Sequence, residues 1–199
     1  MAKYFDKFPK VQSLKDGKII TNLLIRVGVI KDIKHLSVIY YPYNIQEGDT
    51  PELIASKFYN DSEKHWVVTV LNDIYDPFYD WPMTYQQFVA FIDDKYGSQS
   101  AAKSQTHHYE QIVTSTDSYT DQITTNTYII DLNSYTNLIP TNVTKTFPNG
   151  LGVTVDTSKR IVDCFTYELE LNESKRSIKL LKQDYINQIQ SELETLLVA

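Results

Sequence analysis

The stretch YNIQEGDTPELIASKFYNDSEKHWVVTVLNDIYDPFYDW, residues 43–81, decides the fold of this chain because it predicts a strand end, a turn and two short helices. Gly48 and Asp49 turn the chain. Asp49 or Thr50 can cap the next helix, and Pro51 is tolerated in a first turn whose amide would be unpaired anyway. This helix has an apolar inner face, made of Leu53, Ile54 and Phe58.

A second helix is predicted directly after the first. It begins around Asn60–Ser62, three residues that are all good helix caps, and it ends at Asn72 and Asp73. Its apolar residues recur at helical spacing and form one stripe, consisting of Trp66, Val67, Val70 and Leu71.

The segments before and after these two helices also predict secondary structure. SVIYYPY, residues 37–43, is rich in strand formers, and Pro42 marks an edge or a bend because it cannot donate to a ladder. In IYDPFYDWPMTYQQFVAFI, residues 74–92, two prolines bias Asp76 and Trp81 away from helix, so a short strand or turn is expected to close the module here. Thr84 then caps a helix over residues 85–95, with Gly97 after its end.

The flanks predict three further segments, and the chain as a whole is expected to be α+β. Residues 1–36 form an N-terminal extension that contains the run IITNLLIRVGVIKDI. We favour a short helix followed by extended chain for this run, because its apolar positions fit one helical face; its Val and Ile content and Gly28 are the argument for a strand or a break near the middle. Residues 37–96 form a small βααβ module. Residues 97–150 are rich in Ser, Thr, Asn and Gln, which predicts a polar extended arm supported by a partner.

Residues 151–199 are predicted to form a β-hairpin and an amphipathic helix. The hairpin has strands at 153–156 and 161–171, joined by a polar turn at 157–159. In NESKRSIKLLKQDYINQIQSELETLL, residues 172–197, apolar residues three and four apart form a seam that must be buried against the hairpin or another chain. The seam consists of residues 178, 181, 185, 189, 193 and 196.

Composition excludes several classes of protein. A chain of 199 residues with 42% hydrophobic and 13% aromatic residues can bury a core. Its net charge of −6 argues against nucleic acid as a partner. Cys164 is the only cysteine, so it is expected to be a buried thiol and not part of a disulfide or Cys-based zinc site. The N-terminus lacks a signal-peptide pattern and no apolar run is long enough to span a bilayer, which predicts use without secretion and no membrane partner.

Motifs for catalysis are not found, and no enzyme activity, cofactor or metal is expected. Phosphate loops, HExxH sites and nucleophile elbows do not occur in the sequence. His107 and His108 are adjacent, so their side chains are expected to diverge and to serve as surface or interface histidines. Asp73, Asp76 and Asp80 do not follow a calcium-loop pattern and are interpreted as helix-end and turn residues.

These residues carry a family resemblance. YNIQEGDTPELIASKFY resembles the first strand and helix of LysM domains, which usually bind cell-wall glycans, and VLNDIYDP resembles the point where their second helix ends. More specifically, YFDKFPK, YYPYNIQEGDTPELIASKFYND, HWVVTVLNDIYDPFYDWPMT and FIDDKYGS together resemble the baseplate wedge protein with a LysM-like domain of contractile-tailed, T-even-like bacteriophages. The resemblance is specific through Gly97.

The resemblance implies a structural role. A wedge protein of this kind would join neighbouring wedges into the sixfold baseplate, would contact other wedge proteins, and would reside in the virion tail after assembly in the host cytoplasm. The best candidate for partner contact is the aromatic loop of residues Tyr75, Asp76, Pro77, Phe78, Tyr79, Asp80 and Trp81, although Phe78 and Trp81 could instead close the core. The alternative is a peptidoglycan-binding module of a wall-active protein, which would hold sugars near Gly48, Asp49, Thr50 and the same loop.

Overall fold

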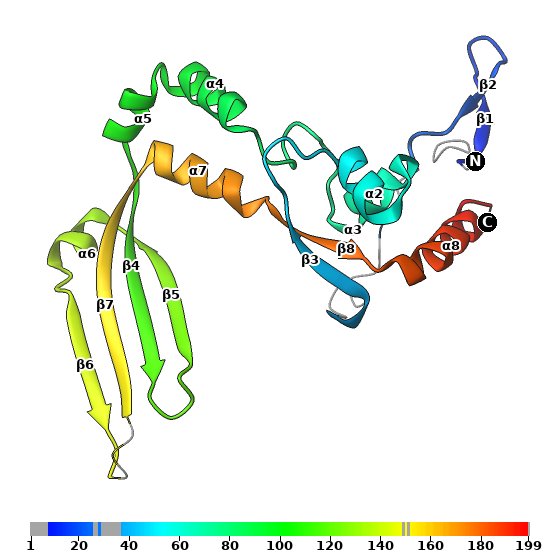
Figure 1. The fold of residues 1–199 in the computed structure, drawn as a ribbon. Coiled ribbons are helices and arrows are strands. Elements are labelled where there is room, and N and C mark those ends of the chain that lie inside the picture. Colours follow the sequence, from blue (N-terminus) through cyan, green and yellow to red (C-terminus); the bar gives the residue numbers. More distant parts are fainter. Residues whose placement is uncertain (1–7, 26–27, 29–36, 149, 151, 199) are drawn as a thin grey trace. The chain divides into compact units, whose positions relative to one another are not determined.

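The computed structural model describes residues 8–25, 28, 37–148, 150 and 152–198, and divides the chain into two compact units (Figure 1). The first unit consists of Met1–Tyr85 together with Asn172–Ala199, and the second of Gln86–Leu171. The second unit is therefore inserted into the first. This division differs from the four consecutive segments expected from the sequence, because residues at both ends of the chain share one core.

The first unit is built around a β-α-α-β arrangement. Its elements are β3 (Tyr40–Asn44), α2 (Pro51–Tyr59), the 3-10 turn η3 (Ser62–Lys64), α3 (His65–Leu71) and β8 (Ser177–Leu181). β3 and β8 are antiparallel, with Tyr40 opposite Leu181 and Asn44 opposite Ser177. Two further backbone hydrogen bonds, from Ile45 N to Arg176 O and from Lys182 N to Ile39 O, extend this pairing at both ends.

The first helix begins as its sequence predicts, and the predicted second helix consists of η3 and α3 and ends at Asn72, as predicted. The side chain of Thr50 accepts a hydrogen bond from Leu53 N, and Pro51 occupies the first turn of α2. Asn60 ends the helix in the left-handed conformation at φ 53°, which Asn tolerates better than most residues. The side chain of Asp61 then accepts from Glu63 N at the start of η3. Side-chain capping thus accounts for the start of α2 and of η3, which leads into α3; the N-cap residue of α3 itself, Lys64, makes no side-chain cap bond.

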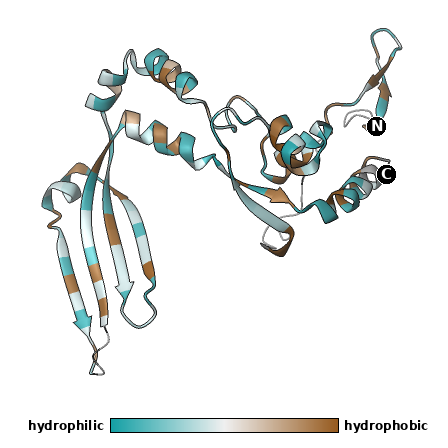
Figure 2. Cartoon of the chain, viewed as in Figure 1, coloured by the Kyte–Doolittle hydropathy of each residue, from teal (hydrophilic) through white to brown (hydrophobic). Residues whose placement is uncertain are grey.

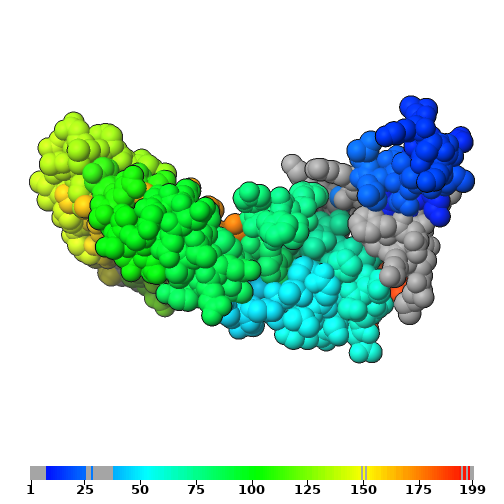
Figure 3. Space-filling view, turned by 90° about the horizontal axis from the view of Figure 1, so that it is seen from above, coloured from blue at the N-terminus to red at the C-terminus, as the bar shows by residue number. Residues whose placement is uncertain are grey.

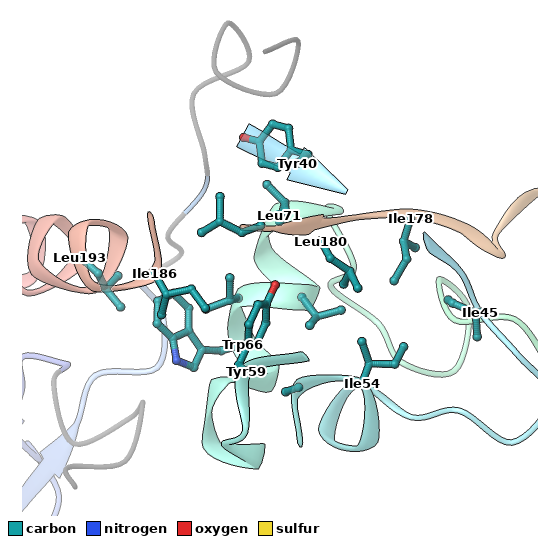
Figure 4. Packing of buried hydrophobic residues seen from close by; sticks show 14 of the residues in the cluster. Tyr40, Ile45, Ile54, Tyr59, Trp66, Leu71, Ile178, Leu180, Ile186 and Leu193 are labelled. Carbon is teal, nitrogen blue, oxygen red and sulfur yellow. The ribbon is translucent and has the colours of Figure 1, made fainter. Parts of the chain in front are cut away.

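The core of the first unit lies between these helices and β8 (Figure 4). Ile54 on α2, Val68 on α3 and Leu180 on β8 are completely buried there. Burial of such aliphatic side chains contributes about 1.5 to 3 kcal/mol each. Helix α8 (Ile186–Val198), which follows the 3-10 turn η4 (Gln183–Tyr185), adds Ile186, Leu193 and Leu197 to the same core.

Two predictions for this unit are corrected by the strand β8. We expected a short strand or turn within residues 74–92 to close the module; residues 77–80 do form a turn, but the strand that pairs with β3 is β8. The terminal seam was predicted on one helix, whereas Ile178 and Leu181 lie in β8, and the α-helix after β8 and η4 covers only residues 186–198. Pairing with β3 and burial in the core outweigh the helical spacing of these apolar residues.

The N-terminal part forms a hairpin of β1 (Lys10–Gln12) and β2 (Ile19–Thr21), and a 3-10 turn, η2 (Ser37–Ile39), precedes β3. Residues 19–21, where we favoured a helix, are therefore a strand. The rest of the predicted helix and extended chain falls largely on residues 26, 27 and 29–36, which lie outside the described residues.

The second unit contains a four-stranded antiparallel sheet of order β5-β4-β7-β6. α4 (Tyr85–Tyr96) and α5 (Gln99–Ser104) precede the sheet, and α7 (Cys164–Ser174) follows it. The strands are β4 (Thr106–Asp117), β5 (Ile123–Ile130), β6 (Thr141–Thr146) and β7 (Gly152–Asp163), with the short helix α6 (Leu132–Asn137) between β5 and β6. Brown and teal patches alternate along these strands, with no long apolar run (Figure 2).

This sheet corrects the prediction of a C-terminal hairpin. Residues 152–163 form one continuous strand, which pairs with β4 on one side and β6 on the other, and residues 164–174 are helical. The polar residues 157–159 do not turn, because each is paired across the sheet, for example Lys159 with Gln111. The predicted polar arm likewise supplies β4, β5 and β6, so much of it is ordered by pairing within the chain itself.

Helices α4 and α7 pack against each other within the second unit. Phe88 and Phe165 meet edge to face at 5.4 Å between ring centroids, and Cys164 is buried, as predicted. The buried carboxylate of Glu168 accepts hydrogen bonds from Lys95 Nζ at 2.7 Å and from Tyr96 Oη at 2.9 Å. The mixed architecture confirms the α+β class.

Candidate functional site

The candidate contact loop, residues 75–81, begins where α3 is fastened to β8. Asn72 Nδ2 donates to Lys179 O at 2.8 Å, and Asn72 Oδ1 accepts from Lys179 N at 2.8 Å. The same amide group also donates to Val68 O at 2.8 Å. One side chain thus pairs with a strand and with the last turn of a helix, which fixes the point where the loop starts.

Two aspartates hold the backbone of the loop. Asp80 Oδ2 accepts from Tyr75 N and Asp76 N, both at 2.9 Å, and Asp76 Oδ1 accepts from Phe78 N at 2.9 Å. The backbone hydrogen bonds lower the pKa of the Asp80 carboxyl, so it stays ionised at neutral pH. The prediction that these aspartates are turn residues is confirmed.

The end of the loop is fastened to the core and to the turn before α2. Trp81 packs against the core cluster, and its Nε1 donates to Asp49 O at 3.1 Å. Lys175 Nζ donates to Tyr79 O from the segment between α7 and β8. Trp81 and Asp49, which form the first of these two bonds, were both candidate site residues in the sequence analysis. Lys175 was missed, because no local sequence signal indicates a contact with Tyr79, 96 positions away.

Three aromatic side chains of the loop are left on the surface. Tyr75, Phe78 and Tyr79 are 57%, 85% and 74% exposed, and Tyr75 Oη also donates to Asp73 Oδ1 at 3.0 Å. In the space-filling view, the turquoise-green surface of this part of the chain lies beside the cyan surface of α2 (Figure 3). Phe78 therefore does not close the core, and Trp81 does contribute to it.

The three residues of the glycan alternative lie in the turn before α2, next to Trp81. Gly48 has a positive φ of 82°, which glycine adopts without strain, and Thr50 caps α2. Asp49 is buried and accepts hydrogen bonds from Tyr43 Oη at 2.6 Å, Lys57 Nζ at 2.6 Å and Gln46 N at 3.0 Å. Its carboxylate is therefore occupied by groups of its own chain.

These hydrogen bonds change the pKa values of Asp49 and Tyr43. Burial alone would raise the pKa of the Asp49 carboxyl, but the hydrogen bonds from Lys57 and Tyr43 outweigh burial and lower it. Burial and the hydrogen bond to Asp49 raise the pKa of Tyr43 to about 12. Asp49 is thus an ionised structural anchor of the turn, and Tyr43 stays a neutral donor.

The adjacent histidines differ from their prediction in one respect: His107 is exposed, as expected, but the two rings lie close together. His107 Nδ1 and His108 Nδ1 approach to 2.7 Å instead of diverging, and the ring of His107 stacks on Tyr167. His108 Nε2 lies 3.0 Å from Glu110 Oε1, and Arg160 Nη2 lies 2.7 Å from Glu110 Oε2. Among the described residues, no group of three or more His, Cys, Asp and Glu side chains is placed to hold a metal ion. This network is a hydrogen-bonded cluster within the second unit.

A rigid loop with exposed aromatic residues is typical of modules that bind other proteins, because aromatic side chains supply contact area at low conformational cost.

A family model described as base plate wedge protein 53 matches residues 30–196, and the chain belongs to this family of bacteriophage baseplate proteins. It is thus a structural component of the phage tail baseplate, as the resemblance implied. No curated protein sequence matches the chain. None of the described helices combines the length and the apolar character needed to span a membrane.

Proposed function

We propose that this chain joins neighbouring baseplate wedges through protein contacts made by the residue 75–81 loop. One observation carries the proposal: Phe78 and Tyr79 are exposed on a loop whose backbone is fixed by Asp76, Asp80 and Trp81. A partner that covers these rings buries apolar area without having to order the loop first.

Membership in a baseplate wedge family supplies the setting for this contact. The neighbouring wedge is the partner that we infer, because the family to which the chain belongs is one of baseplate wedge proteins. A loop held by its own chain can dock onto such a surface without rearrangement. Glycan binding has less support. The carboxylate of Asp49 and the indole N–H of Trp81 would be available to a sugar in an open module, but here each is bonded within the chain.

The test uses the double variant Phe78→Ala, Tyr79→Ala in wedges reconstituted with the other wedge proteins. Joining of wedges is measured by sedimentation velocity and electron microscopy. We expect joining to weaken by about tenfold or more, because exposed aromatic anchors often dominate an interface. The unfolding midpoint of the isolated variant should stay unchanged, because neither ring is buried.

Tyr119→Ala is the matched control, since Tyr119 is 76% exposed but lies in the second unit. It should leave joining through the loop intact. Normal joining by the double variant would refute the role of the loop, and unfolding of that variant would show that the rings serve the core. A pull-down on purified peptidoglycan separates the alternative, which requires saturable binding that the double variant loses.

A further inference from the structure

Strand β5 is an edge of the sheet in the second unit, and its register shows which backbone groups point outward. Asp117 N donates to Gln122 O, so this pair at the hairpin end is hydrogen bonded. Bonded and non-bonded pairs alternate along an antiparallel ladder. Residues 124, 126, 128 and 130 therefore direct their N–H and C=O groups to β4, and residues 123, 125, 127 and 129 direct theirs to the outer edge.

This edge lacks the features that usually prevent strand pairing. The sequence of β5, ITTNTYII, contains no charged residue and no proline, and its register with β4 runs without a bulge from Ile123 to Ile130. The opposite edge, β6, also pairs with its neighbour without a bulge, but it differs in length, charge and flanking residues. It is shorter, contains Lys145, and lies between Pro140 and Pro148. Of the two edges of this sheet, β5 is therefore the better suited to accept another strand.

Charge marks both ends of β5. Asp121 lies in the turn before the strand, in the left-handed conformation, and Asp131 follows the strand directly. Asp131 caps α6 by accepting from Asn133 N at 2.8 Å and Ser134 N at 3.0 Å, so its carboxylate is held in place. A neutral edge with an acidic group at each end favours a partner strand with basic ends.

The side chains of β5 add apolar contact area. Ile123 and Ile129 are 67% and 74% exposed and lie on the same face of the sheet, since they are six positions apart on one strand. Tyr128, on the other face, is 53% exposed. A strand laid along the edge would cover parts of these side chains on both faces, which supplements the backbone hydrogen bonds.

We propose that β5 binds an extended, β-branched, uncharged segment of another polypeptide that carries Lys or Arg at both ends. A second copy of this chain does not fit. Antiparallel pairing of two β5 strands would place Asp121 of one copy near Asp131 of the other, and parallel pairing would place identical aspartates together. Like charges at both ends oppose either arrangement.

The test uses the full chain and a synthetic peptide of alternating Thr and Val, as long as β5, with paired lysines at each end. Binding is measured by calorimetry, and amide exchange of residues 123–130 is followed by NMR. We expect protection of the four outward amides, those of Ile123, Thr125, Thr127 and Ile129, and binding about tenfold or more weaker for the same peptide with glutamates in place of the lysines.

Two sets of variants make the result decisive. Thr127→Pro removes one outward amide without removing a bond to β4, and it should abolish peptide binding. Asp121→Asn with Asp131→Asn keeps residues that suit the left-handed turn and the helix cap, and it should remove the preference for lysine. Equal binding of both peptides by the wild-type chain, protection elsewhere, or unchanged binding by Thr127→Pro would overturn the proposal. The double Asn variant gives the answer even if Thr127→Pro does not fold.

This surface is separate from the residue 75–81 loop, which belongs to the other unit. Loss of wedge joining in the loop variant and loss of peptide binding in the β5 variants are therefore independent results.

Discussion

The indole Nε1 of Trp81 donates a hydrogen bond to the backbone carbonyl oxygen of Asp49 at 3.1 Å. This bond connects the end of the exposed aromatic loop with the turn that begins α2, across 32 positions of the sequence. Because Asp49 is itself bonded to Tyr43 and Lys57, the loop is linked to β3 and α2 through a single residue.

Trp81→Phe should destabilise the first unit by about 1 to 2 kcal/mol, because it removes this hydrogen bond and part of a packed ring. Urea unfolding followed by circular dichroism measures the difference. Phe78→Ala is the control and should change stability by less than about 0.5 kcal/mol, since Phe78 is exposed. A larger cost for Phe78→Ala than for Trp81→Phe would contradict the assignment of the two aromatic residues.

Asn72→Ala should cost about 1 to 2 kcal/mol, because the side chain bonds both backbone groups of Lys179 as well as Val68 O. The amide of Lys179 should also exchange faster with solvent, which NMR can follow. Asn137→Ala is matched in chemistry but removes an exposed contact within α6, so a change of less than about 0.5 kcal/mol is expected. Unchanged exchange at Lys179 in Asn72→Ala would show that the side chain does not hold β8.

Asp49→Asn should destabilise the chain at neutral pH, and the difference from the wild type should shrink in acid. The folded-state pKa of Asp49 lies below its ordinary value of 3.8, so its ionised form contributes stability above about pH 4. That contribution is lost as the pH falls through the folded-state pKa. Free energies of unfolding measured from pH 7 to pH 2 check the sign, and a difference that grows in acid would refute it.

Lys57→Met removes the ion pair of Asp49 but keeps its carboxylate, so its stability can be compared with that of Asp49→Asn. The Lys57 side chain is half-exposed, so solvent screens its ion pair with Asp49, and its loss should cost less than Asp49→Asn. The hydrogen bonds from Tyr43 and Gln46 remain in this variant.

Elements with strong local signals could be predicted from the sequence. Thr50 and Pro51 set the start of α2, and α4 runs from Tyr85 to Tyr96 before Gly97, close to its predicted bounds. Asn60, which we expected at the start of the second helix, ends α2 instead. The phage baseplate family could also be recognised from residues 4–98, although the family match extends to residue 196. These signals depend on neighbours within a few positions, so they do not need the folded chain.

Errors arose where a long-range partner decides the conformation. Ile178 and Leu181 have helical spacing but form a strand, because β3 offers them backbone partners and the core covers them. Residues 157–159 have the polarity of a turn but continue β7, because β4 and β6 pair with it on both sides.

In the candidate loop, too, local sequence predicted some features and long-range contacts decided others. Its aromatic residues and aspartates are evident in the sequence, but only the structure separates Trp81, which is fastened to the core, from Phe78, which is exposed. The sequence by itself determined the helix caps, the turn chemistry and the family. Tertiary structure decided which strand closes the first unit and which aromatic rings face solvent, because backbone pairing and burial depend on segments far apart in the sequence.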